Sequence, residues 1–524
     1  MLERDKIKNK RMLVKVYGAA VQGIDATIVT IEVNSSRGIK FFLVGLPDSA
    51  VKESHERIIS ALQVNGYKFP TCQIVVNMAP ADIRKEGSAY DLPLAIGILA
   101  ATQIVSEEKL SRYLIIGELS LDGSLQPVKG ALSIAISARE QGFEGFILPK
   151  QNAREAAVVN NLKVYGVENI KEVIEFFNNE RNLEPSIVNT REEFYEHQSS
   201  FPYDFADVKG QWAAKEAIAT AVCGYHSILM MGPPGVGKTI LARRIPSILP
   251  PMSPKEKLET EIIYSVSGRL FNNKKDITER PFRTVDNRIT KAGLIGGGNP
   301  PYPGEVSFAH KGVLFADEML EMPVRTLESL REPMEERQVR LIRRGMVNVF
   351  PADFIFIGAT NPCRCGFLGD PVHRCTCSQT EIEKYRSRLS GPLADRIDMC
   401  IEIQRADYGE MKGERTQSTC QLRRMVEAAG KIQDMRFEGR EFSRNSRMNE
   451  RDVEEFCQLK KDCRRFIGRL YDVFGISPRR YHKILKLART LADMDGEDDI
   501  EEEHLASAFQ YTRLLTGDRN KNYV

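Results

Sequence analysis

The sequence lacks an apolar run long enough to cross a membrane. A membrane-spanning helix needs roughly 18 consecutive apolar residues, whereas the longest run here, residues 92–101, is shorter and is interrupted by Pro93. No apolar segment follows the basic start MLERDKIKNKR, which argues against a secretory signal. We therefore expect a protein that works in the cytoplasm and has no membrane partner.

The sequence also lacks a strong charge of either sign. Its 74 Lys and Arg residues nearly balance 71 Asp and Glu residues, for a net charge of +3. Net charge therefore neither predicts nor excludes binding to nucleic acid, and only local clusters can do so. Ten cysteines in 524 residues, without a secretory signal, argue against a disulfide framework and for a reducing compartment.

Patterns along the chain predict a multidomain α/β protein. Short runs rich in β-branched residues alternate with helix-like segments over residues 1–180. Residues 181–203 are polar, have no sustained apolar face and are interpreted as a linker. Strand-like runs return over residues 204–403, whereas residues 404–524 are rich in helix formers and predict a helical domain.

A glycine-rich loop, GPPGVGKT, stands between a short apolar run and a helical pattern. Strand, loop and helix in this order are the context of a phosphate-binding loop. Its glycines let backbone N–H groups surround phosphates, and the helix adds its positive end. Lys238 is predicted to reach the β- and γ-phosphates, and the Thr239 hydroxyl to bind Mg²⁺. ATP is expected to contact Gly232, Pro233, Pro234, Gly235, Val236, Gly237, Lys238 and Thr239.

A second motif, GVLFADE, follows the glycine-rich loop along the chain. Its apolar residues predict a buried strand that ends in two carboxylates, Asp317 and Glu318. Asp317 is predicted to hold Mg²⁺, and Glu318 to polarise the attacking water. A third apolar run, FIFIGATN, ends at Asn361. In a nucleotide-binding sheet this end lies beside the second motif, so Asn361 is predicted to orient the water.

Four cysteines form two C-x-C pairs shortly after Asn361. Four thiolates that converge from two turns suit a tetrahedral zinc ion, and they leave no open position for catalysis. His373 lies between the pairs as a spare ligand. The one-residue spacing is tighter than usual, and the alternative is four reduced thiols in a loop. The predicted zinc ligands are Cys363, Cys365, Cys375 and Cys377.

Together these motifs resemble AAA+ ATPases of the magnesium-chelatase-like branch, and specifically the YifB/ComM family. The blocks GLIGGGNPPYPGEVSFAHKGVLFADE, NPCRCGFLGD and RRYHKILKLARTLAD carry the likeness. The resemblance implies a Lon-protease-like N-terminal domain (1–180), an AAA+ module (204–403) and a helical lid (404–524). It also implies a homohexameric helicase that acts on single-stranded or branched DNA and promotes branch migration during natural transformation, with recombination proteins as further partners.

The resemblance also assigns roles to two arginines. Arg396, in GPLADRID, matches an arginine finger that reaches into a neighbouring subunit, and so implies a ring. Arg479, in SPRR, matches a sensor arginine of the lid that contacts the γ-phosphate, and Arg388 is a second basic candidate near the finger. One block departs from the family: RPFR is followed by TVDN where the family has two histidines, which leaves their role open here.

The N-terminal region resembles Lon proteases without their catalytic groups. Ala89 stands where the nucleophilic serine is expected, and Leu132 where the lysine is expected. A Ser–Lys dyad needs both groups, and Ser88 and Lys129 are displaced from these positions. We therefore expect no peptidase activity.

The segment ERQVRLIRRGMVNVF predicts a hairpin with a basic tip that grips DNA phosphates, or else a solvated edge hairpin. Its arginines are Arg337, Arg340, Arg343 and Arg344. A glycine run at 296–298 predicts an exposed loop. The alternative to a DNA motor is a chelatase-type ATPase that remodels a protein partner. That system needs a metal-binding D-x-S-x-S domain, which would have to come from another chain.

Overall fold

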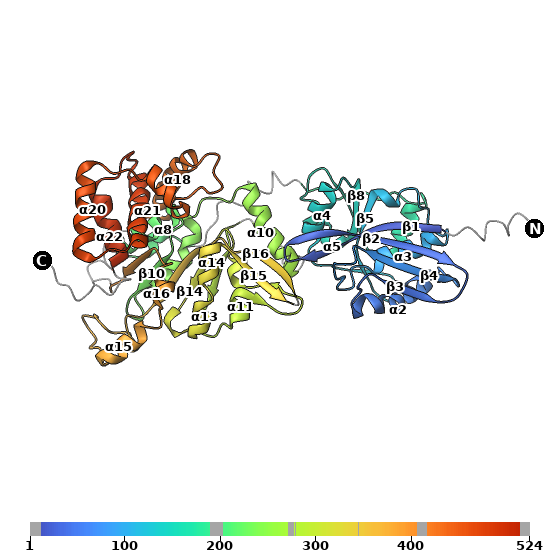
Figure 1. Ribbon diagram of the computed structural model, residues 1–524, viewed down its shortest axis with the longest axis horizontal. Coiled ribbons are helices and arrows are strands. Elements are labelled where there is room, and N and C mark those ends of the chain that lie inside the picture. The colour runs from blue at the N-terminus through green and yellow to red at the C-terminus, as the bar shows by residue number, and fades with distance from the viewer. Residues whose placement is uncertain are drawn as a thin grey trace, which may run out of the picture. The chain divides into compact units, whose positions relative to one another are not determined.

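A computed structural model describes residues 12–188, 203–270, 277, 279–343, 345–405 and 417–513. The described chain forms two compact units (Figure 1). The first takes in the described residues of Met1–Glu196 and Glu261–Asp276, and the second those of His197–Thr260 and Ile277–Val524.

The first unit is built on a mixed seven-stranded sheet with the order β3-β4-β2-β1-β5-β8-β9. The long antiparallel pair β1–β2 forms its centre, and β5, β8 and β9 add parallel strands on one side. Apolar residues alternate along β2, so that Val29, Ile31 and Val33 are fully buried on one face. The strands are β1 (Met12–Gln22), β2 (Asp25–Ser36), β3 (Phe41–Val44), β4 (Gln73–Ala79), β5 (Tyr113–Ile115), β8 (Gly145–Pro149) and β9 (Lys163–Val167).

Five complete α-helices lie in the described residues of this unit. Every residue of α3 is buried, which explains why its sequence is apolar all round. A short separate hairpin pairs β6 (Glu118–Leu119) with β7 (Leu125–Gln126). The helices are α2 (Ser49–Val64), α3 (Asp91–Ala101), α4 (Ala131–Glu140), α5 (Lys150–Ala156) and α6 (Ile170–Phe177).

The second unit contains a five-stranded sheet with the order β11-β14-β17-β10-β18, in which every pairing is parallel. The three apolar runs that surround the predicted nucleotide motifs are three adjacent strands, β14, β17 and β10, and each is buried throughout. The expected α/β class is therefore confirmed. The strands are β10 (Ile228–Met231), β11 (Phe282–Val285), β14 (Val313–Ala316), β17 (Ile355–Thr360) and β18 (Met399–Glu402).

Helices and two small hairpins surround this sheet. The α-helices are α8 (Trp212–Gly224), α9 (Lys238–Arg244), α11 (Lys291–Ile295), α12 (Glu305–Phe308), α13 (Val324–Glu328), α14 (Arg331–Glu336), α15 (Gln379–Arg386) and α16 (Gly391–Ala394). A further helix, α10 (Pro254–Ser267), begins in the second unit and ends in the first. The hairpins pair β12 (Gly296–Gly297) with β13 (Tyr302–Pro303), and β15 (Gln338–Arg343) with β16 (Met346–Pro351).

The prediction of an exposed glycine loop at 296–298 is wrong for its first two residues. Gly296 and Gly297 are buried in the β12–β13 hairpin, whereas residues 298–300 are exposed. Gly296 has a φ of 98°, and a Cβ there would lie 2.5 Å from the carbonyl oxygen of Tyr302. Glycine is therefore required because two backbones approach closely.

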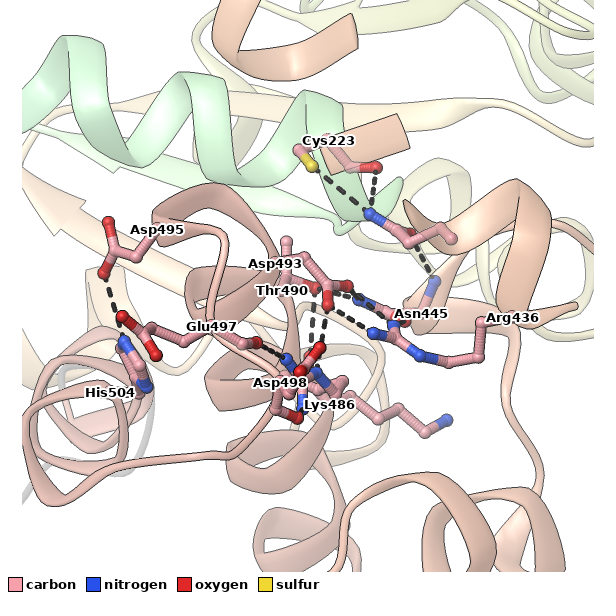
Figure 2. A network of polar contacts seen from close by, with 12 residues as sticks. Cys223, Arg436, Asn445, Lys486, Thr490, Asp493, Asp495, Glu497, Asp498 and His504 are labelled. Atoms are coloured by element: carbon pink, nitrogen blue, oxygen red, sulfur yellow. Dashed lines mark hydrogen bonds and ion pairs between the residues drawn. The ribbon is translucent and has the colours of Figure 1, made fainter. Parts of the chain in front are cut away.

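The C-terminal part is helical in its described residues, as predicted. Its α-helices are α18 (Thr419–Arg436), α19 (Glu450–Phe456), α20 (Lys461–Phe474), α21 (Pro478–Asp495) and α22 (Glu502–Arg513). Figure 2 shows the buried Asp493 of α21, which accepts bonds from Arg436 of α18 (2.7 Å) and from Asn445 (2.7 Å). Gln433 of α18 also donates to the carbonyl oxygen of Cys223 at the end of α8 (3.3 Å). The Gln433 bond ties the helical part to α8 in the sheet-bearing part of the same unit.

Candidate nucleotide site

The predicted nucleotide residues meet at the carboxyl edge of the parallel sheet. The glycine-rich loop follows β10, Asn361 follows β17, and Asp317 follows β14. Lys238 Nζ lies 3.1 Å from Asn361 Oδ1, and Thr239 Oγ1 lies 2.9 Å from Asp317 Oδ2. Residues far apart in the sequence are thus brought together where ligands bind in such sheets.

The Lys238 ammonium is held inside the loop that carries it. It donates to the carbonyl oxygens of Gly232 (2.6 Å) and Pro233 (2.9 Å). Burial lowers the pKa of Lys238 to about 8, although Asp317 and Glu318 oppose this shift. A bound phosphate would supply the negative charge that this desolvated ammonium lacks.

Two features of the loop require glycine. Gly237, directly before α9, has a φ of 96°, in the left-handed region that other residues avoid. A Cβ on Gly232 would lie 2.3 Å from the carbonyl oxygen of Ile403. The loop therefore has the backbone conformation and the close packing that a phosphate cradle requires.

The oxygens of Thr239 and Asp317 form a pair suited to a hard divalent cation. A hydroxyl and a carboxylate 2.9 Å apart beside a phosphate site are ligands that Mg²⁺ accepts. Glu318 follows in the left-handed conformation, with a φ of 47°, and is exposed at the edge of the sheet. Glu318 lies outside β14, and its exposed carboxylate can contact a water molecule.

Asn287 is a site residue that sequence reasoning missed. Its Nδ2 donates to Glu318 Oε2 at 3.2 Å. It lies just after β11, the strand next to β14, in the TVDN block that departs from the family pattern. A polar residue after a strand next to the carboxylate strand was the available signal, because parallel strands end at one edge.

Arg396 lies at the amino ends of the parallel strands, whereas Lys238 lies beyond their carboxyl ends. It precedes β18, which runs parallel to β10, and its carbonyl oxygen accepts a bond from Ser227, the residue before β10 (2.8 Å). Four strand residues at about 3.3 Å each separate the two edges by roughly 13 Å. The structure therefore does not bring Arg396 to the nucleotide residues of its own chain.

Arg479 shares that edge. Its guanidinium is 4.0 Å from the carboxylate of Asp395, the neighbour of Arg396, and is largely exposed. Lys483, one turn along α21, donates to the carbonyl oxygen of Ile397 (2.7 Å). Arg388 is anchored elsewhere, donating to the carbonyl oxygen of Met322 (3.0 Å).

The four predicted zinc ligands converge. Their sulfur atoms all lie within 4.8 Å of one another. The individual distances are 3.4 Å for Cys363–Cys365, 3.7 Å for Cys363–Cys375 and 3.5 Å for Cys365–Cys375. A tetrahedral zinc with bonds of about 2.3 Å would place its sulfurs roughly 3.8 Å apart. The cluster therefore fits zinc.

The cysteine segment also contacts the glycine-rich loop. A Cβ on Gly366, inside this segment, would lie 2.8 Å from Pro234 Cδ. The cysteine segment therefore packs against the loop that is predicted to hold phosphates, and a bound metal would brace that contact.

The β15–β16 hairpin is partly basic, as predicted, and also apolar at its surface. Ile342 is 63% exposed and Val347 is 49% exposed, and Arg343 is exposed beside them. Arg337 is not at the tip: it precedes β15, and burial lowers its pKa to about 10. Arg344 lies outside the described residues.

The Lon-like positions contain no Ser–Lys pair. Ala89 carries no hydroxyl, and Leu132 is fully buried in the first unit. The displaced Ser88 donates to the carboxylate of Glu118, and the displaced Lys129 is exposed. Neither displaced group restores the dyad.

Comparison with known proteins agrees with this arrangement. Family models match residues 204–411 (magnesium chelatase, subunit ChlI), 31–152 (subunit ChlI of Mg-chelatase) and 416–512 (magnesium chelatase, subunit ChlI C-terminal). Competence protein ComM of Haemophilus influenzae is 37% identical over 513 residues, covering 95% of this chain and 97% of that protein. The chain belongs to the YifB/ComM family. It is a magnesium-chelatase-like AAA+ protein.

Two further relatives extend the picture of this YifB/ComM protein. The uncharacterized protein YifB of Escherichia coli is 36% identical over 510 residues, covering 95% of this chain and 97% of its own. Lon protease 2 of Bacillus subtilis is 30% identical over 232 residues, covering 39% of this chain and 42% of that protein. Within the described residues, no helix combines the length and apolar character of a membrane span.

Proposed function

We propose that this protein is an ATP-driven motor that forms a ring of six copies and moves along DNA, promoting branch migration during DNA uptake and recombination. The observation that carries the proposal is the separation of Arg396 from Lys238 across one sheet. A finger at one edge and a phosphate loop at the other complete each other only between neighbouring copies, since neither half reaches its counterpart in the same chain.

The chemistry of the site follows from its groups. Lys238 and the loop N–H groups bind the phosphates, and Thr239 and Asp317 hold Mg²⁺, which neutralises developing charge when bound. Glu318, oriented by Asn287, aligns the attacking water, and Asn361 completes the polar edge beside it. Arg396, with Arg479 beside it, reaches the γ-phosphate held by the adjacent copy.

DNA is the proposed track. The exposed β15–β16 hairpin combines basic and apolar side chains, which suits sequence-independent contact with a phosphate backbone and bases. The relative named competence protein ComM supports a place in DNA uptake. Structural zinc on the four cysteines is part of the proposal, as a brace for the glycine-rich loop.

The test is ATP turnover by the purified full-length protein with no DNA, single-stranded DNA or a forked duplex, together with strand displacement on a labelled three-way junction. The proposal expects turnover that DNA stimulates, displacement of the labelled strand, and a ring in the presence of ATP and DNA. Turnover that DNA leaves unchanged, with no displacement, would favour the chelatase-type alternative of an ATPase that remodels a protein partner.

A further inference from the structure

The guanidinium of Arg396 is engaged within its own chain. Arg396 Nε lies 3.1 Å from Glu335 Oε2, a second guanidinium nitrogen contacts the same carboxylate, and Nη1 donates to the carbonyl oxygen of Pro392 (2.6 Å). The Arg396 side chain is only 15% exposed as a result, while that of Glu335 is 52% exposed. A finger held in this way is folded back against its own subunit.

Glu335 belongs to the element that leads into the β15–β16 hairpin. It is in the last turn of α14, and Arg337 then turns the chain into β15 in the left-handed conformation, with a φ of 57°. The carbonyl oxygen of Arg337 accepts a bond from Ala352 after β16 (2.7 Å), which closes the base of the hairpin. The helix end and the hairpin base are therefore one continuous structure.

The two ends of this structure carry different chemistry. Its hairpin end has exposed Ile342, Val347 and Arg343, and its helix end has the carboxylate of Glu335, which holds Arg396. A displacement of the hairpin would move Glu335 by way of the short turn at Arg337. Two residues, 336 and 337, thus connect Glu335 to the first strand of the hairpin.

We propose that Glu335 is an autoinhibitory latch on Arg396, released when DNA engages the β15–β16 hairpin. Release frees the guanidinium to reach the γ-phosphate bound by the adjacent copy, so that ATP is hydrolysed at a high rate only on a DNA-loaded ring. The inference rests on the proposed function and adds to it how DNA raises turnover. Glu335 acts through Arg396 and is a positioning residue.

The experiment compares the DNA-free and DNA-stimulated ATP turnover of Glu335→Gln with that of the wild type. The expected result is a DNA-free rate raised about fivefold, the shift in population that follows from losing one partly buried ion pair. The ratio of stimulated to basal rate falls by a similar factor, because DNA has less to release. Glu335→Asp, which keeps the charge on a shorter arm, should give a smaller rise.

The matched control is Glu332→Gln, one turn earlier on α14, where the side chain is exposed and the same charge is removed. It should leave both rates unchanged. The double variant Glu335→Gln/Arg396→Ala should be as inactive as Arg396→Ala, because the gain acts through the finger. Thermal melting of each variant establishes that it is folded.

A DNA-free rate for Glu335→Gln that equals or falls below the wild-type rate would overturn the latch. So would an equal rise in Glu332→Gln. This comparison needs no DNA, so it decides on the latch even where the wild type is not stimulated. Absence of DNA stimulation and of strand displacement in the wild type would instead overturn the proposed function.

Discussion

The two units differ in whether their predicted catalytic groups are present. In the first, the positions predicted to match the Lon dyad are Ala89 and Leu132, which carry neither a hydroxyl nor an amine, and Leu132 is fully buried. The second retains its site groups, and Lys238 stays partly buried against a polar loop. A buried apolar side chain therefore stands where the dyad would need an amine, whereas the second unit holds a desolvated ammonium in its loop.

The comparison teaches that resemblance in fold and resemblance in activity must be judged residue by residue. Burying a leucine side chain stabilises a fold by roughly 1.5–3 kcal/mol. Leu132 therefore stabilises the first unit, and a lysine in its place would lose that contribution. In the second unit, Lys238 contacts Asn361, and Thr239 contacts Asp317.

The largest expected effect is on ATP turnover in the second unit. Glu318→Gln should still bind ATP, because the phosphate loop is untouched, but should reduce turnover by about 10³-fold through loss of the carboxylate that aligns water. Phosphate release measured at saturating ATP gives the rate, and binding of a fluorescent ATP analogue gives the affinity. The control in the first unit is Ser88→Ala, which should leave turnover unchanged; a matching loss there would break the contrast between the units.

Restoring the missing lysine of the first unit should cost stability and yield no peptidase. Leu132→Lys puts an unpaired ammonium at a fully buried position, which should lower the free energy of unfolding by at least about 3 kcal/mol. Urea unfolding followed by circular dichroism measures the loss. Leu132→Met, which conserves volume, should cost less than about 1.5 kcal/mol. Equal stability of the lysine variant would mean that this position is not the closed packing site described above.

Metal removal should affect the second unit alone. The protein purified without chelator should contain about one zinc per chain, and Cys365→Ser should reduce that content and lower the melting temperature of the unit that holds it. Elemental analysis and calorimetry measure the two quantities. Cys72→Ser, in the first unit, is the matched control and should leave the zinc content unchanged. A wild-type protein without zinc would leave the four thiols as the reduced cysteines of the alternative interpretation.

The smallest expected effect is a pH dependence in the first unit. Burial raises the pKa of Glu155 to about 7, and hydrogen bonds from Ser265 and Asn152 only partly offset it. A raised carboxyl pKa means that the ionised form is penalised, so stability is lost as pH rises from about 4.5 to 7. Glu155→Gln should therefore stabilise the protein more at pH 8 than at pH 5.5, by about 1–2 kcal/mol. Equal melting-temperature gains at the two pH values would contradict the assignment.

Much of the second unit could be predicted because its signals are contiguous. A strand, a glycine loop and a helix follow one another in sequence, so GPPGVGKT predicted both a local structure and the place of Lys238. The ends of neighbouring parallel strands meet by geometry, so Asp317 and Asn361 could be placed beside it. The observed contacts of Lys238 and Thr239 agree with this placement.

The residues that were missed depend on contacts between distant segments. Asn287 meets Glu318 only because β11 lies next to β14, and Glu335 meets Arg396 only because α14 packs near the turn before β18. Neither pairing leaves a spacing that can be read along the chain. The glycine run at 296–298 was misread for a related reason, since its requirement comes from the close approach of Tyr302 and not from exposure.

The separation of Arg396 from Lys238 across one sheet has a genetic consequence. If Arg396 of each copy acts in the nucleotide site of the next, a copy that lacks Arg396 keeps its own site intact but inactivates the site of its neighbour. A copy that lacks Lys238 has an inactive site of its own but still supplies Arg396 to its neighbour. Mixed assemblies of these two kinds of damaged copy would therefore regain working pockets wherever the order of defects is right, although each kind alone would be inert.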